Sequence, residues 1–154
     1  YNVLFYSGAK NYLGHDKTSM NNLYILPDDK PTEGPFGQGN HKPFCANNDG
    51  AKANSSGFRE TWANNRCILA RPASTYKYGN CDSSSAAALA ATSDHTFGNT
   101  FFLNDTGALS FKCGHATWDL AKAQQMGWDA GSVAAPLPTA DEIVAWSKEI
   151  LSML

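Results

Sequence analysis

Short apolar segments, each led by an Asn, recur along the chain and set its hydrophobic pattern. In the three clear copies the third residue is an aromatic ring or a thiol, the fourth is Ile or Phe, and the fifth is Leu. These copies occupy residues 22–26, 65–69 and 99–103, and a weaker copy occupies residues 2–6. One apolar unit that recurs in this way is the sequence signature of a repeat architecture.

The second half of each repeat supports the same interpretation. A Cys follows each clear copy at a variable distance, at Cys45, Cys81 and Cys113. Strands that recur while their loops vary in length indicate a stacked coil with insertions on its turns. The sequence therefore predicts an all-β fold, a right-handed parallel β-helix of about four coils. The alternative is a chance alignment of three apolar strands within an ordinary all-β domain.

Alternation along a strand predicts which side chains of each repeat point inward. The two predicted inward columns are Leu4, Tyr24, Cys67 and Phe101, and then Tyr6, Leu26, Leu69 and Leu103. The leading Asn suits a bend before each strand, because its short amide tolerates left-handed backbone and bonds to its neighbours. Stacked Asn side chains would also form a hydrogen-bonded ladder, as in other in-register stacks.

The carboxyl-terminal part of the chain is predicted to be helical. Asp119 can cap a short helix over residues 120–126, with Gly127 supplying the left-handed stop. Residues 139–142 form a capping box, and apolar residues at helical spacing continue to Leu154. We expect this amphipathic helix to cover the open last rung of the coil. The predicted division is residues 1–116 as coils with long loop insertions and residues 117–154 as a helical cap.

Composition excludes two classes of partner. The chain has 154 residues, a net charge of −2 and only 17 % charged residues. It contains no basic patch for nucleic acid, and no apolar run approaches the ~20 residues of a membrane span.

Four cysteines and two glycosylation acceptors favour a secreted protein in an oxidising compartment. The acceptors are Asn54 and Asn104. Equivalent positions on adjacent coils would bring cysteines within bridging distance. Of the three possible pairings we therefore rank Cys45–Cys81 with Cys67–Cys113 first. The alternative is a cytosolic protein with four buried thiols.

Two stretches carry a family resemblance. Residues 119–132 have a Leu-x-x-x-Gln helix followed by Gly-x-Asp-x-Gly-Ser, and residues 22–28 have Asn-x-Tyr followed by a Pro-Asp turn. Together they resemble the secreted right-handed β-helix proteins of the pectate-lyase-like group, and the tail motif resembles their carboxyl-terminal end. Members cleave or bind polysaccharides, or serve as extracellular structural and adhesive proteins. The resemblance implies the carboxyl-terminal part of such a protein. Because the ionisable loop residues form no recognisable acid–base pair, we expect part of any site to lie upstream of Tyr1.

The densest ionisable group is His15, Asp16 and Lys17. A polysaccharide lyase needs a base beside a uronate carboxylate and a cation that neutralises this carboxylate, and these residues offer both. A glycoside hydrolase would instead need two carboxylates about 5–9.5 Å apart. The candidates for such a pair are Asp16, Asp28, Asp29, Glu60, Asp94 and Asp105. The simpler interpretation is that all of these are solvated loop charges.

Other residues with functional chemistry form no recognisable motif. His41, His95 and His115 are scattered and no close Cys pair exists, so we expect neither a metal nor a cofactor. The tryptophans would stack on sugar rings or, more commonly, belong to the core. They are Trp62, Trp118, Trp128 and Trp146.

Two functions remain open from the sequence. The first is the carboxyl-terminal part of a secreted protein that acts on or binds a polysaccharide, inactive as an isolated chain. If it is an enzyme, it is a polysaccharide lyase or a glycoside hydrolase. The second is a non-catalytic extracellular scaffold or filament subunit. Its partner would be an upstream β-helix segment or another subunit, which pairs with the open edge at Tyr1.

Overall fold

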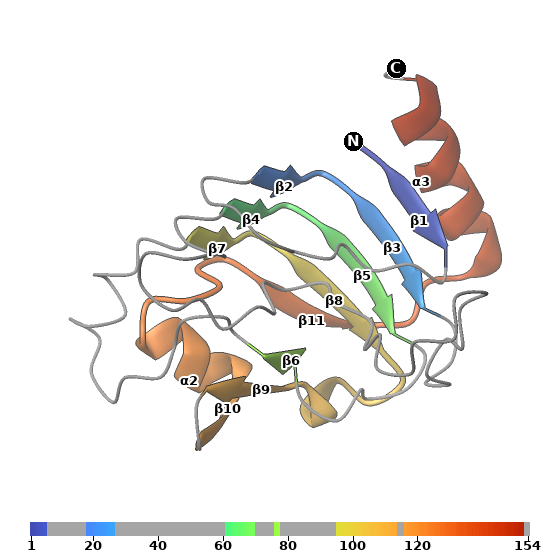
Figure 1. The fold of residues 1–154 in the computed structure, drawn as a ribbon. Helices are drawn as coiled ribbons and strands as arrows, with labels where there is room; N and C mark the ends of the chain where they lie inside the picture. Colours follow the sequence, from blue (N-terminus) through green and yellow to red (C-terminus); the bar gives the residue numbers. More distant parts are fainter. Residues whose placement is uncertain (6–17, 27–60, 70–75, 78–94, 114–115, 153–154) are drawn as a thin grey trace, which may run out of the picture.

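The fold is built around one parallel sheet that contains the predicted repeat strands. The computed structural model describes residues 1–5, 18–26, 61–69, 76–77, 95–113 and 116–152. Each strand of this five-stranded sheet runs parallel to its neighbours (Figure 1). In spatial order the strands are β1 (Val3–Phe5), β3 (Leu23–Leu26), β5 (Arg66–Leu69), β8 (Thr100–Leu103) and β11 (Val133–Pro136).

The register of this sheet is the one that the Asn repeat predicts. Tyr24 lies opposite Cys67, and Cys67 lies opposite Phe101. All three side chains are buried in one cluster together with Leu103, so the inward direction predicted for these residues is confirmed. Leu4 lies opposite Tyr24 in the backbone register. The side chains that fall outside the described part are those of Leu4, Tyr6, Leu26 and Leu69.

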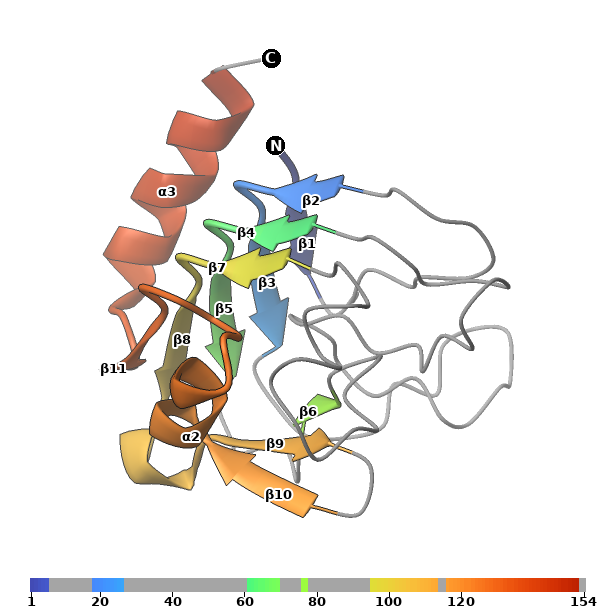
Figure 2. The same ribbon diagram turned by 90° about the vertical axis from the view of Figure 1, so that its left-hand side faces the viewer.

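A second parallel sheet stands beside the first, and its strands directly precede three strands of the first sheet. It contains β2 (Thr18–Met20), β4 (Thr61–Ala63) and β7 (His95–Phe97). Two residues separate each of these strands from β3, β5 or β8, so three strand–bend–strand corners stack on one another (Figure 2). A bridge from Phe97 to Ala130 continues the stack toward β11. These corners supply two sides of each predicted coil, and the right-handed β-helix stays a prediction.

A third sheet and a short helix face the interior of the main sheet. The sheet contains β6 (Tyr76–Lys77), β9 (Ser110–Cys113) and β10 (Ala116–Asp119), and α2 (Leu120–Gln125) follows β10 directly. Asp119 caps α2 by accepting a hydrogen bond from the Lys122 backbone N–H, as predicted. Phe101 meets Phe111 edge to face across the interior, with ring centroids 5.7 Å apart. The buried residues of this interior also include Trp62, Trp118 and Trp128, which are therefore core residues and not sugar platforms.

The last helix, α3 (Ala140–Ser152), covers the outer face of the main sheet. Its capping box forms as predicted, with Thr139 N–H donating to Glu142 and the Glu142 N–H donating to the Thr139 hydroxyl. The Thr139 backbone hydrogen bond lowers the pKa of Glu142 from its usual range, and the Thr139 hydroxyl lowers it further. The predicted position over the last rung is wrong, because Ile143, Trp146 and Ile150 pack on outward residues of β1, β3, β5 and β8 instead. Those outward residues are Val3, Leu23, Ile25, Ile68 and Phe102.

The strand β11 is absent from the sequence-based expectation and lies within the segment predicted as a separate cap. Val133 pairs with Thr100, so Ser132 occupies the level of Asn99. Pro136 removes one backbone N–H, which is tolerated because β11 is an edge strand. The repeat thus continues one rung further than the Asn pattern indicates, with Ser in the leading position.

The bends between paired strands use left-handed backbone at the residue before the repeat position, not at the repeat Asn itself. Asn21, Asn64 and Gly98 have φ angles of 58°, 55° and 65°. A Cβ on Gly98 would overlap Oδ1 of Asn64, whereas Gly131, the corresponding residue one level on with φ of 70°, has open space around it.

We therefore expect Gly98→Ala to be more destabilising than Gly131→Ala. Both substitutions place a Cβ on left-handed backbone, at about 1–2 kcal/mol. Gly98→Ala also forces the Asn64 side chain off its rotamer, which adds about 0.5–1.5 kcal/mol. Urea unfolding of the two variants measures this difference directly. Equal losses in the two variants would show that the Asn64 side chain does not lie against Gly98.

Candidate functional site

A continuous ladder of side-chain hydrogen bonds connects the leading residues of the repeats. The Nδ2 of Asn2 donates to Oδ1 of Asn22 at 3.0 Å, and Asn22 donates to Asn65 at 3.1 Å. Asn65 donates in the same way to Asn99, and Asn99 donates to Oδ1 of Asp129, both at 3.1 Å. The ladder that the sequence predicts is therefore present, and every step has the same direction.

The ladder also satisfies backbone groups at the bends. The backbone N–H of Asn22 donates to Oδ1 of Asn65, and that of Asn65 donates to Oδ1 of Asn99. The Nδ2 of Asn65 gives its second hydrogen to the Ser19 carbonyl, and that of Asn99 to the Trp62 carbonyl. These backbone groups are buried or partly buried, so without the carboxamides they would be left unpaired. The Asn side chains therefore stabilise the bends by satisfying these groups.

The ladder ends on a buried acidic residue at its carboxyl-terminal side. Asp129 is completely buried and accepts from Asn99 and from the Ser132 hydroxyl. Gln124 on α2 donates to the carbonyls of Asp129 and Ser132, at 3.1 and 2.7 Å. It is α2, through Gln124, that closes the last bend of the stack.

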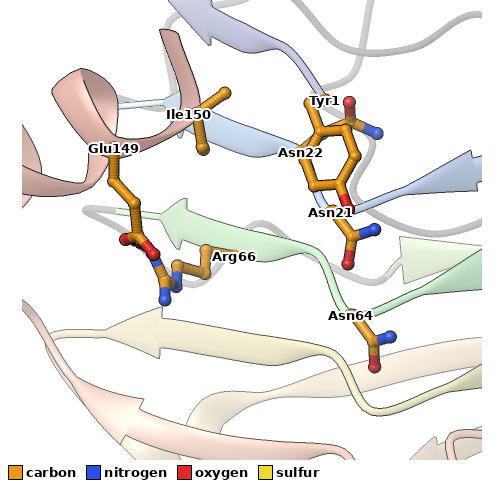
Figure 3. A pocket seen from close by; sticks show the side chains of 7 residues that line it. All are labelled: Tyr1, Asn21, Asn22, Asn64, Arg66, Glu149 and Ile150. Atoms are coloured by element: carbon orange, nitrogen blue, oxygen red, sulfur yellow. Dashed lines mark ion pairs between the residues drawn. The ribbon is translucent and has the colours of Figure 1, made fainter. Parts of the chain in front are cut away.

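A pocket of about 250 Å³ opens at the amino-terminal end of this ladder, between the bends and α3 (Figure 3). The ring of Tyr1 stands on one side, and the amides of Asn21 and Asn64 project from successive left-handed bends (Figure 3). The described residues that line it are Tyr1, Asn21, Asn22, Asn64, Arg66, Glu149 and Ile150. This volume lies just below the ~300–1,000 Å³ of sites for drug-sized ligands, so the pocket suits a small polar group.

Arg66 fixes the side of the pocket that faces α3. Its guanidinium lies 3.6 Å from a carboxylate oxygen of Glu149 and 4.7 Å from the centroid of the Trp146 ring. Both charged side chains are partly exposed, so the ion pair itself adds little stability. Its effect on the pocket is positional, because stacking on Trp146 and pairing with Glu149 hold the guanidinium plane beside the cavity.

The chemistry of this lining is that of binding. Carboxamides and a guanidinium offer fixed donors and acceptors, and the Tyr ring offers a flat apolar face. Among the lining residues that the structure describes, Glu149 is the one carboxylate, whereas glycoside hydrolysis uses two.

Most of the residues that the sequence analysis proposed for catalysis fall outside the described part of the chain. These are His15, Asp16, Lys17, Asp28, Asp29, Glu60 and Asp94. Asp105 is described, and it caps a short 3₁₀ helix, η1 (Thr106–Ala108), by accepting from the Gly107 N–H. Its position indicates a structural role. A catalytic role for His15, Asp16 and Lys17 stays a prediction.

The predicted glycosylation and disulfide residues are only partly within the described ranges. Asn104 lies exposed at the turn that follows β8, where an acceptor Asn would be reachable, and Asn54 lies outside the described ranges. Cys67 is buried in the interior. Cys113 ends β9 but its side chain is not described, and Cys45 and Cys81 are outside the ranges, so the pairing stays a prediction.

The described ranges hold neither a metal-binding cluster nor a membrane-spanning helix. Within these ranges, no group of three or more His, Cys, Asp or Glu side chains is arranged to hold a metal ion. None of the described helices has the length and apolar character needed to cross a membrane.

The pocket residues were missed by sequence reasoning. The Asn-Asn doublets at residues 21–22 and 64–65 were an available signal, since only the second Asn of each belongs to the ladder. The approach of Glu149 to Arg66 had no such signal, because it depends on where α3 packs. Comparisons of the chain with models of known families, with curated proteins and with solved structures find no significant match.

Proposed function

We propose that the chain is part of a secreted β-helix protein that binds a polysaccharide through the pocket beside Arg66. The stacked corners support the β-helix, because strand–bend–strand units in constant register are what consecutive coils require. Secretion is supported by Asn104, an acceptor residue on an exposed turn.

One observation carries the binding proposal. The pocket brings a Tyr ring, three carboxamides and a guanidinium to a single small cavity. A sugar residue presents hydroxyl groups around its edge, each of which both donates and accepts, and C–H groups on its faces. Asn and Arg side chains match the edge, and the ring of Tyr1 matches a face. The register of the sheet repeats these bends at constant spacing, so a chain of sugars would meet Asn21 and Asn64 in turn.

The ion pair favours a neutral sugar over a uronate. A uronate carboxylate would compete with Glu149 for Arg66 and would bring a second negative charge into the pocket. Neutral hydroxyls avoid this repulsion and can bond to both members of the pair. We therefore propose a neutral polysaccharide as the ligand class.

Calorimetric titration with neutral and uronate oligosaccharides tests the proposal. We expect neutral oligosaccharides to bind and Asn64→Gly to weaken their affinity about tenfold, the worth of one or two hydrogen bonds. Gly suits the left-handed backbone at this position, so the variant should remain folded. Asn104→Ala, which removes the same amide away from the pocket, serves as the control and should leave the affinity unchanged.

Glu149→Gln tests the charge argument in the same titration. Removing the carboxylate should raise the affinity for uronate oligosaccharides relative to neutral ones. Binding of uronates alone to the unmodified protein would contradict the neutral ligand class, and no binding of any oligosaccharide, or full binding by Asn64→Gly, would contradict the site.

An extracellular scaffold is the second candidate function. Asn2 is exposed at the end of the ladder, and β1 is an edge strand of the main sheet. An edge strand presents unpaired backbone groups that another strand can use. This observation favours assembly through the β1 edge. Glycan binding in the pocket does not depend on that assembly.

A further inference from the structure

We propose that the β1 edge binds an extended polypeptide strand that runs parallel to β1 and begins with Asn. The ladder supplies the reason, because its two inner steps make the same pair of hydrogen bonds. The Oδ1 of Asn65 receives both the backbone N–H and the Nδ2 of Asn22, and the Oδ1 of Asn99 receives the same two groups of Asn65.

Asn2 stands at the open end of this series. It donates to Asn22, it is exposed, and no described residue donates to its Oδ1. By the pattern of the two inner steps, this oxygen would accept from a backbone N–H and a carboxamide Nδ2 on one residue of an added strand. Asn is the residue that offers both groups at that distance from its Cα and also carries the ladder onward.

The backbone pattern gives the same direction and register. Leu23 N–H donates to the Asn2 carbonyl at 2.8 Å, and Arg66 N–H donates to the Asn22 carbonyl at 2.9 Å. The step from Thr100 to the Asn65 carbonyl, at 2.8 Å, is equivalent. The N–H of Val3 would therefore donate to the carbonyl of the incoming Asn, which sets a parallel strand in register with β1.

The opposite end of the ladder does not offer the groups that a head-to-tail stack of copies of this chain would use at the ladder position. The carbonyl of Ser132 corresponds to the carbonyls that receive the next rung, but Gln124 already donates to it. The Ser132 hydroxyl is directed to Asp129. Since the chain's own side chains occupy the Ser132 groups, the ladder position of the β1 edge does not match the carboxyl-terminal end of a second copy.

The last turn of α3 is placed to cover such a strand. In both views α3 continues past β1, beyond the edge of the main sheet (Figures 1 and 2). Leu151 on this turn is 60 % exposed, while Ile150 beside it is buried against the outer face. An added strand would extend the apolar outer face beneath the overhanging turn, as β1 and β3 do further along the helix.

A peptide with the sequence of residues 21–26, followed by lysines for solubility and carrying a fluorophore, is the probe. Its anisotropy is measured against the full chain of 154 residues. We expect this peptide to bind saturably. A second peptide, with Asp in place of the second Asn, should bind with at least tenfold lower affinity, since a carboxylate cannot donate a hydrogen bond. We expect the same loss for the Asn2→Leu protein, whose fold is checked by thermal unfolding because Asn2 is exposed at the edge.

The outcomes separate this surface from the glycan pocket. Unchanged oligosaccharide affinity in Asn2→Leu, with loss of peptide binding, is the expected combination. Equal binding of the Asn and Asp peptides would overturn the Asn-specific proposal, as would no saturable binding of either. Self-association of the protein that Gln124→Ala strengthens would also contradict it, since that result would show stacking through the β11 end.

Discussion

Replacing Asn65 by Ala should lower the free energy of unfolding by about 3–4 kcal/mol, an unusually large effect for one polar residue. Asn65 is 0 % exposed, and its carboxamide holds groups on three other residues. It accepts from Asn22 and donates to the Ser19 carbonyl and to Oδ1 of Asn99. Ala removes all of these partners at once and leaves buried polar groups unpaired, each at a cost of about 1–3 kcal/mol.

Asn2→Ala is the matched control for this prediction. It removes the same side chain from the same ladder, but Asn2 is exposed and makes a single ladder hydrogen bond. Its loss should cost less than about 1 kcal/mol, because water replaces the missing partner. Chemical denaturation of both variants gives the comparison. Similar losses at the two positions would mean that the ladder does not hold the corners together.

Phe101→Ala should lower the free energy of unfolding by about 3–5 kcal/mol. Phe101 is 0 % exposed, lies opposite Cys67 in the inward column and packs edge to face on Phe111. The neighbouring sheets cannot close around the missing ring, since strands on both sides hold their spacing through backbone hydrogen bonds. The substitution therefore leaves a cavity in addition to the lost burial.

Phe97→Ala provides the control for the core substitution. Phe97 lies on β7 and is 39 % exposed, so the same change should cost within about 1 kcal/mol. Thermal and urea unfolding measure both losses. A small loss for Phe101→Ala, comparable to that of Phe97→Ala, would contradict the position of the interior between the main sheet and β9.

The sequence predicts the main sheet because its physical cause is local and repeats. Asn22, Asn65 and Asn99 each precede an apolar strand, and stacking identical residues in register satisfies their hydrogen bonds at every level. The same logic fails at Ser132, where the leading residue changes and the strand that follows consists of Val, Ala and Pro. There the Ser132 hydroxyl accepts the Asn99 backbone N–H, and β11 is an edge strand. Neither feature produces the Asn-led apolar pattern from which the other strands were predicted.

The placement of α3 was missed because the repeat has two apolar faces. The inward residues Tyr24, Cys67 and Phe101 account for one face. Ile25, Ile68 and Phe102 alternate with them and need cover on the other side, so α3 lies across the sheet and not over its end. The apolar fourth position of each repeat carried this information.

The pocket follows from that placement and so was also missed. Only when α3 lies on the outer face does Glu149 reach Arg66, and only then does Trp146 support the guanidinium. Contacts of this kind join residues far apart in the chain through tertiary packing, for which a single sequence holds no periodic signal. The loop charges His15, Asp16 and Lys17, which sequence reasoning favoured, lie outside the described residues, so their role stays a prediction.

NMR of protein labelled with ¹⁵N only in Asn, titrated with a neutral oligosaccharide, tests the proposed function at its site. The side-chain amides of Asn21 and Asn64 line the pocket, those of Asn65 and Asn99 are buried in the ladder, and Asn104 is remote. We predict saturable shifts for the amides of Asn21 and Asn64, and slow hydrogen exchange without comparable shifts for those of Asn65 and Asn99. A neutral oligosaccharide that leaves Asn21 and Asn64 unshifted, or that shifts Asn104 instead, would contradict the account.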